Sequence, residues 1–334
     1  MKKRIWLYVL LAILLSGGLY YAYNLIRLNR VDSKEFSMEI KVSDSLKHMG
    51  VFDGVFYGLE GNKLRGVDKD KGLVFEKHLG LGINDIVYDK FIYVSQEDGL
   101  IRAFDRFDGT LFAKLDLGEK VYNLDLVDKK LLAYGRDKVF VMDMYLKDMT
   151  VESFDYRPVK YEFSDHDQAL IFLDRELGGL KSRFEIYREG KKTYYISSVD
   201  ELFMYTSFLS DKSNVLLTNS YLYLINNGKL IRKTFILNPR AIDVKNDKIA
   251  LVDDESLKIF DKDLKLLEEV NLSFKADNIM IVRDKILLVG NNFMASYEDN
   301  NLIKTDVANM KSYFLEKDGI YVVMPNRIEK VKAY

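Results

Sequence analysis

Beyond position 31, apolar residues occur in short runs or alternate with polar residues, and no long stretch follows the 3.6-residue period of a helix. The runs are rich in Val, Ile, Phe and Tyr and are closed by Asp, Asn, Gly or Lys, as at 91–94, 138–142 and 285–289. β-branched and aromatic residues bounded by turn-forming residues are typical of strands. The pattern therefore predicts an all-β fold for this part of the chain.

The predicted turns recur at a nearly regular interval. An Asp closes the first strand of each unit, at Asp53, Asp89, Asp128, Asp167, Asp211, Asp247, Asp284 and Asp318, with spacings of 36, 39, 39, 44, 36, 37 and 34 residues. The second unit contains four predicted strands, over 83–88, 91–95, 100–105 and 110–115. Four short strands in about 38 residues are the signature of a propeller blade. We expect an eight-bladed β-propeller, with a seven-bladed ring and one degenerate unit as the alternative.

The last unit is one strand short, because only 320–324 and 327–332 follow its Asp turn. The alternating segment 36–42 precedes the first complete unit and provides a spare strand. Closing a ring of blades removes sheet edges that would otherwise promote aggregation. We therefore expect strand 36–42 to pair with the C-terminal blade.

A membrane segment is predicted before the propeller. Residues 5–26 carry no formal charge over 22 positions and follow the basic run 2–4. At 1.5 Å per residue such a helix spans about 33 Å, enough for a hydrocarbon core of about 30 Å. We expect 1–30 to be a signal-anchor with a cytoplasmic N-terminus, in a single-pass cell-membrane protein whose propeller, 31–334, is extracytoplasmic. A signal peptide cleaved at the small residues 16–18 is the alternative.

Composition excludes several classes of site. The chain has no Cys, which excludes disulfides, a thiolate nucleophile, Cys-ligated zinc, iron–sulfur clusters and the lipid-bearing Cys of a bacterial lipoprotein. Five basic residues precede position 31, so the rest carries 45 basic against 51 acidic residues. This net negative charge argues against nucleic acid as a partner.

Residues 93–112, YVSQEDGLIRAFDRFDGTLF, resemble the repeat of quinoprotein-like (PQQ-like) propellers. That repeat reads as a strand, an Asp-Gly turn, a strand ending in Ala-x-Asp, and then a Gly followed by an aromatic residue. Residues 66–72 and 259–264 resemble it less closely. The resemblance implies an eight-bladed quinoprotein-like fold, similar to uncharacterised membrane-anchored propellers of Gram-positive bacteria, in which Phe75 and Phe112 dock between blades.

The resemblance does not extend to the enzymes of that family. Active quinoprotein dehydrogenases resemble one another in a vicinal disulfide and in a Trp that stacks on the cofactor. This chain has no Cys, and its single Trp is Trp6, in the predicted membrane segment. No nucleophile elbow, Walker loop or zinc-protease helix is present, and the run 165–167, Asp-His-Asp, is interpreted as a turn. We expect no enzyme activity, catalytic residue, cofactor or metal.

The loops of the predicted propeller indicate where a partner would bind. The long fourth unit places extra residues 174–182 as a loop between its second and third strands. Insertions on one face of a repeat array often mark the functional face. The partner-binding residues predicted there are Asp174, Arg175, Glu176, Gly178, Gly179 and Lys181. An acidic rim for a basic segment or a cation is a second hypothesis for the same set of loops, made by Glu60, Glu97, Asp98, Asp137, Asp253, Asp254 and Glu255.

These observations favour a binding protein over a catalyst, because propellers offer a wide, rigid face onto which loops place function. We expect a non-enzymatic scaffold or accessory subunit that binds another protein of the cell envelope. The alternative is a sensor that takes a glycan or peptide into the central channel, lined by Tyr122, Tyr161, Tyr205 and Tyr313. A hydrolase or lyase is a third class, which no group of residues supports.

Overall fold

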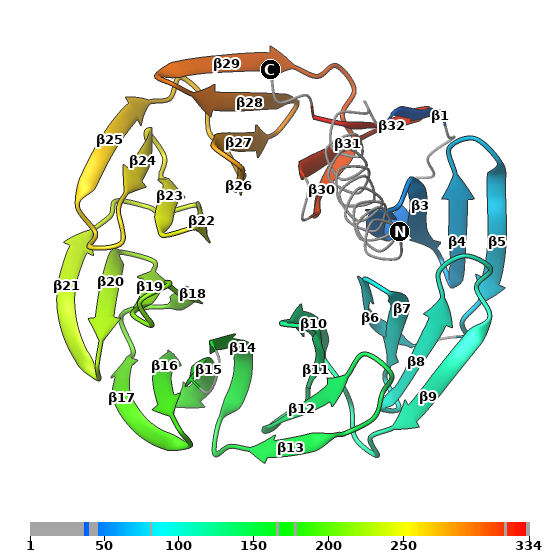
Figure 1. Ribbon diagram of the computed structural model, residues 1–334, viewed down its shortest axis with the longest axis horizontal. Helices are drawn as coiled ribbons and strands as arrows, with labels where there is room; N and C mark the ends of the chain where they lie inside the picture. The colour runs from blue at the N-terminus through cyan, green and yellow to red at the C-terminus, as the bar shows by residue number, and fades with distance from the viewer. Residues whose placement is uncertain are drawn as a thin grey trace, which may run out of the picture.

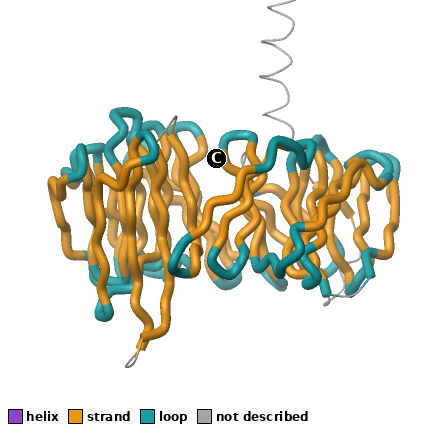
Figure 2. The backbone as a smooth tube through the Cα atoms, turned by 90° about the horizontal axis from the view of Figure 1, so that it is seen from below, coloured by secondary structure: helices purple, strands orange, loops and turns teal. Residues whose placement is uncertain are grey.

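The computed structural model describes residues 37–39, 46–80, 82–164, 167–176, 179–316 and 319–331. In these ranges the chain forms strands and no helix, arranged as eight four-stranded sheets around a common axis (Figure 1). Seen from the side, the strands cross the thickness of a disc (Figure 2). The eight-bladed prediction is confirmed, and the seven-bladed alternative is wrong.

The described ranges include no helix with the length and apolar character needed to span a membrane. The predicted membrane segment 5–26 lies outside them.

Each blade is an antiparallel meander whose first strand lies nearest the axis. Blades 1 and 2 comprise β2 (Leu46–Phe52), β3 (Val55–Glu60), β4 (Lys63–Asp68), β5 (Gly72–His78), β6 (Ile83–Tyr88), β7 (Phe91–Gln96), β8 (Leu100–Asp105) and β9 (Leu111–Asp116). Blades 3 and 4 comprise β10 (Asn123–Val127), β11 (Lys130–Tyr134), β12 (Lys138–Asp143), β13 (Thr150–Ser153), β14 (Arg157–Ser164), β15 (Asp167–Glu176), β16 (Gly179–Arg188) and β17 (Lys191–Ser198).

The second half of the ring repeats this arrangement. Blades 5 and 6 comprise β18 (Phe203–Phe208), β19 (Asn214–Thr218), β20 (Tyr221–Asn226), β21 (Lys229–Phe235), β22 (Ala241–Lys245), β23 (Lys248–Val252), β24 (Ser256–Phe260) and β25 (Leu266–Asn271). Blades 7 and 8 comprise β26 (Asn278–Val282), β27 (Lys285–Gly290), β28 (Phe293–Glu298), β29 (Asn301–Asp306), β30 (Ser312–Glu316), β31 (Gly319–Met324), β32 (Arg327–Lys330) and β1 (Ser37–Glu39).

The two ends of the described chain meet in blade 8. Its strand order is β1-β32-β31-β30, so the N-terminal strand is the outermost strand of the C-terminal blade. Ser37 lies opposite Glu329 and Met38 lies opposite Ile328 in an antiparallel pair. Met38 is buried in the cluster between blades 8 and 1. Main-chain hydrogen bonds and apolar packing therefore join the two ends of the ring.

The second strand of each blade is the most apolar because neighbouring blades cover both of its faces. All six residues of β7 and all six of β31 are buried, whereas six of the seven residues of β21, an outermost strand, are exposed. A strand buried on both faces is expected as a continuous apolar run rather than an alternating one. This explains why runs such as 91–94 stand out in the sequence.

Eight hydrophobic clusters fill the eight interfaces between successive blades. Phe75 shows how the first interface closes: it is 7% exposed and its ring packs on Gly66 of its own blade and Gly109 of the next. A Cβ atom at Gly109 would lie 2.5 Å from that ring, and the φ of +67° there also favours glycine. Phe112 is instead half exposed and stacks on Phe91 at 4.3 Å.

The innermost strands of neighbouring blades are not paired with each other in a sheet. Carboxylate side chains link them instead. The Oδ2 atoms of Asp85 and Asp243 accept hydrogen bonds from the backbone N–H groups of Leu124 (2.8 Å) and Ile281 (2.6 Å), each in the next blade. Glu316 in blade 8 accepts one from the N–H of Val51 in blade 1, at 3.1 Å. Acidic residues of the inner wall are thus structural ties between blades.

Six of the predicted Asp turns lie between the first and second strands of their blades. Asp53, Asp128 and Asp247 have φ values of 49°, 46° and 61°, a left-handed conformation that Asp tolerates better than most residues. Asp167 was placed wrongly, because it is the first residue of β15. Asp318 lies outside the described residues.

Candidate functional site

The two faces of the disc carry different connections. Because successive strands run antiparallel, the turns between second and third strands lie on the same face as the connections from one blade to the next. We call this the connecting face. The predicted partner-binding residues and the predicted acidic rim both belong to it.

A hairpin projects beyond this face, at blade 4 (Figure 2). Strands β15 and β16 each have ten residues, and their pairing continues without a shift from Asp167–Arg188 to Glu176–Gly179. The prediction of an inserted loop over 174–182 was therefore wrong: these residues lengthen the two strands. Hydrogen bonds across the hairpin pair the backbone N–H and C=O groups, which in an irregular loop would bond to water instead.

The register places most of the predicted partner-binding residues along the projecting end. Asp174 lies opposite Lys181, Arg175 opposite Leu180, and Glu176 opposite Gly179. Arg175 and Gly179 are exposed, and Leu180, which the sequence analysis did not single out, is 54% exposed. Gly178 lies outside the described residues.

Buried contacts hold the base of the hairpin. Arg183 is 9% exposed, and its guanidinium carbon lies 3.3 Å from the ring centre of Tyr156, in the connection between blades 3 and 4. Its Nη1 donates a hydrogen bond to the Tyr195 hydroxyl at 3.3 Å, and its Nη2 lies 4.0 Å from the Asp174 carboxylate. A desolvated cation on an aromatic face is a strong form of this contact. The projecting hairpin therefore grows from a fixed base.

A second contact ties the hairpin to blade 5. The Ser182 hydroxyl accepts a hydrogen bond from the Phe203 N–H at 3.3 Å, and Phe203 is buried between blades 4 and 5. Large apolar side chains are exposed at this junction, at Leu180 (54%), Tyr195 (46%), Val199 (65%), Leu202 (41%) and Met204 (42%). Exposed apolar groups beside a projecting element are a feature of protein-binding surfaces.

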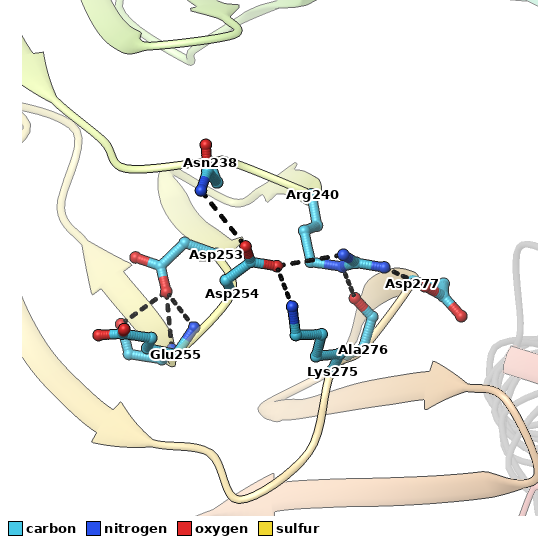
Figure 3. A network of polar contacts seen from close by, with 9 residues as sticks. Asn238, Arg240, Asp253, Asp254, Glu255, Lys275, Ala276 and Asp277 are labelled. Atoms are coloured by element: carbon cyan, nitrogen blue, oxygen red, sulfur yellow. Dashed lines mark hydrogen bonds and ion pairs between the residues drawn. The ribbon is translucent and has the colours of Figure 1, made fainter.

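Part of the predicted acidic rim is neutralised rather than open. In the network of Figure 3, Asp254 lies between Arg240 and Lys275, at 3.2 and 3.3 Å, and accepts a hydrogen bond from Asn238 at 3.3 Å. Arg240 also donates to the Ala276 carbonyl at 2.9 Å and pairs with Asp277 at 2.5 Å. The pKa of Asp254 is lowered overall: Lys275 lowers it most, burial raises it, and Arg240 lowers it further.

Other members of the rim are engaged as well. Asp253 is 3% exposed, forms an ion pair with Lys258 and caps its own turn. Glu60 pairs with Arg65, and Glu97 lies 3.5 Å from Lys120. Within the described ranges, no three His, Asp or Glu side chains are grouped so that they could hold a metal ion. The hypothesis of an open acidic rim is therefore wrong for Glu60, Glu97, Asp253 and Asp254. For the exposed residues Asp98, Asp137 and Glu255 it stays a prediction.

The tyrosines proposed for the channel are largely used in packing. Tyr161 is fully buried between blades 3 and 4, and its hydroxyl donates to Glu152 at 2.7 Å. Tyr205 packs against the cluster between blades 5 and 6, and Tyr313 accepts a hydrogen bond from Asn278 at 2.9 Å. Tyr122 lies under the Arg157 guanidinium, 4.4 Å from its centre. This arrangement does not favour the channel hypothesis.

The inner wall does contain a compact charged group. The Lys160 ammonium lies 3.1 Å from Asp125 and 3.2 Å from Glu162. Burial lowers the pKa of Lys160, but the two carboxylates outweigh it and raise that pKa overall. Burial raises the pKa of Glu162 more than Lys160 lowers it. The group joins blades 3 and 4 by an ion pair, in line with the other carboxylate ties of the inner wall.

Comparison with known proteins agrees with this architecture. No family model matches the sequence, and no curated protein matches it. The fold is shared with solved structures. The computationally designed Ika8 protein has a TM-score of 0.66 at 10% identity over 89% of this chain and 99% of that chain. BamB from Moraxella catarrhalis has 0.60 at 9% identity, over 88% and 97%. Sqt1 from Saccharomyces cerevisiae has 0.62 at 10%, over 88% and 96%.

At these identities the likeness shows the fold alone. The similarity to BamB supports the propeller fold that residues 93–112 led us to expect. The sequence comparisons give no support for membership of the quinoprotein family or for kinship with Gram-positive membrane-anchored propellers. The propeller fold is compatible with a protein-binding scaffold.

Proposed function

We propose that this protein is a non-enzymatic scaffold of the cell envelope, anchored in the membrane through residues 5–26, that binds another protein by the connecting face of its extracytoplasmic propeller. One observation carries the proposal: the blade 4 hairpin projects from that face. Its far end presents Arg175 and Leu180 to solvent. A rigid element with an exposed apolar side chain and a cation suits insertion into a partner's groove.

Preorganisation supports the proposal. Arg183 and Ser182 hold the base of the hairpin in contacts with the connection between blades 3 and 4 and with blade 5. A binding element that is already ordered loses little conformational entropy when it docks, so more of its contact energy remains as affinity. The exposed apolar side chains at its base, Val199 and Leu202 among them, would extend the contact beyond the hairpin itself.

The absence of an enzyme role is part of the proposal. The carboxylates of Asp253, Asp85 and Asp243 have structural partners. A catalytic group must be free to exchange protons or contact a substrate. We therefore assign these groups to the stability of the blades.

The test is capture of partners from the native membrane by the full chain. In the test variant, Arg175→Glu is combined with Leu180→Ser, which removes the cation and the apolar group at the end of the hairpin. We expect a stoichiometric envelope protein to co-purify with the wild type and to be lost with this variant. The matched control combines Ile303→Ser with Lys304→Glu on the exposed outer strand β29.

The control should retain the partner, because β29 is the outermost strand of blade 7, on the outer circumference of the disc and not on the connecting face. Equal loss in both variants would contradict the assignment to the hairpin. Retention in both would place the binding surface elsewhere. Localisation is tested separately, by protease treatment of intact cells: cleavage of the propeller from outside supports the extracytoplasmic assignment, and protection contradicts it.

A further inference from the structure

The outermost strand of each blade has one backbone edge without a strand partner, because each sheet ends there. Such edges can pair with an extended segment of another chain. In five blades the outer strand carries a bulge near its start, with one residue unopposed. These residues are Val74, Phe112, Thr193, Ile231 and Leu267. A bulge interrupts pairing locally and leaves a regular strand beyond it.

The outer strand of blade 5, β21, differs from the others in composition. Its seven residues, KLIRKTF, include three cations and no acid, whereas β25 of the next blade has Glu268 and Glu269. Large apolar side chains are also exposed along it: Leu230 is 46%, Ile231 58% and Phe235 62% exposed. The outer strand of blade 4, β17, also has two cations and no acid, but its Lys192 pairs with Glu185 at 2.8 Å. The three cations of β21 are the most in any outer strand of the described ranges.

The bulge at Ile231 sorts these side chains onto two faces. Lys229 lies opposite Asn226 and Arg232 opposite Leu224, two residues apart on β20, so Lys229 and Arg232 share a face. Leu230 and Phe235 lie opposite Ile225 and Tyr221, which places them on the other face. Without the extra residue, Lys229 and Arg232 would lie on opposite faces.

The cations on the two faces differ in their contacts. Lys233 is engaged: it lies 3.2 Å from Glu201 and 3.6 Å above the ring centre of Tyr221. Lys229 and Arg232 are exposed, and neither makes an ion pair or side-chain hydrogen bond with the described residues. They are therefore available to a negatively charged partner.

From this geometry we propose that β21 is a docking edge for an extended acidic segment of another protein, which adds to blade 5 as a fifth strand. Acidic side chains of the segment pair with Lys229 and Arg232 on one face, and its apolar side chains cover Leu230 and Phe235 on the other. The backbone of Arg232–Phe235 supplies the regular ladder. This surface is on the outer circumference of the disc, so it is independent of the hairpin of blade 4.

A lipid surface is the competing ligand, because anionic headgroups would also attract the two cations. A membrane has no backbone to pair with a strand edge, which is why we assign the site to a peptide segment. The probe is a short capped peptide of alternating Glu and Val with a fluorescent label. An otherwise identical peptide with alternate N-methylated residues keeps the charge and apolar content and lacks the strand donors.

The experiment measures fluorescence anisotropy with the full chain at low salt. We expect the Glu–Val peptide to bind, the N-methylated peptide to bind on the order of tenfold more weakly, and Lys229→Glu with Arg232→Glu to weaken binding by at least as much. The control, Lys114→Glu with Lys265→Glu, changes the same net charge at exposed positions on other blades and should bind as the wild type does.

Equal binding of the two peptides would overturn strand addition. If the control variant lost as much peptide binding as the Lys229 and Arg232 variant, net charge alone would explain the loss. That result would overturn the assignment to β21. Binding to vesicles of phosphatidylcholine and phosphatidylserine without binding to the peptide would replace the peptide segment with a membrane surface. Binding to neither probe would overturn the proposal.

Discussion

The guanidinium carbon of Arg183 lies 3.3 Å from the ring centre of Tyr156, so a buried cation joins the base of the projecting hairpin to the connection between blades 3 and 4. This contact couples the stability of the hairpin base to a neighbouring loop. It also explains how two strands can extend beyond the blade and keep a fixed direction.

Replacing Arg183 by Leu should therefore loosen the hairpin. The loss of a desolvated cation on an aromatic ring costs about 2 kcal/mol in unfolding free energy. Urea denaturation gives that figure, and amide hydrogen exchange over 174–181 should speed up. Lys120→Leu is the control, because its ammonium lies 5.5 Å from the ring centre of Tyr122. We expect less than about 0.5 kcal/mol there, and an equal loss would contradict the role of Arg183.

Gly109→Ala should destabilise the first blade interface more than Gly54→Ala does. Both glycines have positive φ, +67° and +80°, so both variants incur backbone strain of about 1 kcal/mol. Only at Gly109 would the new Cβ meet the Phe75 ring, which adds about 1–3 kcal/mol of overpacking. Thermal unfolding of the two variants separates these effects. Equal melting temperatures would show that the ring moves aside freely.

Met38→Ala tests the closure of the ring. Met38 is 2% exposed and packs against residues of blades 8 and 1, so truncation should cost about 2–5 kcal/mol. Met204→Ala is the matched control, because Met204 is 42% exposed, and it should lie within about 0.5 kcal/mol of wild type. Chemical denaturation measures both. A neutral Met38 variant would mean that the ring closes without this strand.

Asp253→Asn tests the pH dependence of the sixth blade. Burial raises the pKa of Asp253, but Lys258 and the N–H groups of Glu255 and Ser256 outweigh it and lower that pKa overall. A lowered folded-state pKa means that the stabilisation is complete above the unfolded value, about 4, and is lost as the pH falls through the lowered value.

The Asn variant should thus lose about 1–3 kcal/mol at pH 7. Its difference from wild type should shrink as the pH falls below about 4, because the wild-type carboxylate becomes protonated there. Urea unfolding at several pH values measures this. A difference that stays constant down to acid pH would show that the charge of Asp253 does not contribute.

Much of the candidate site lay beyond sequence reasoning. The excess length of the fourth unit correctly marked the segment 174–182, but its conformation depends on continued cross-strand pairing between Asp174 and Lys181. The acidic residue Asp254 stood out in the sequence, whereas its partners Arg240 and Lys275 come from two other connections. The two faces of β21 depend on a bulge opposite β20 that no local pattern indicates.

The sequence by itself determined the number of blades, the turns and most strand bounds, because these rest on local propensities repeated at an almost constant interval. In blade 2, for example, β6 and β8 have the predicted bounds, and β7 and β9 differ by one residue. Tertiary structure alone decided which charges are neutralised, which aromatic residues are buried and where the hairpin points. Those properties come from side chains brought together across blades, and sequence spacing does not specify such contacts.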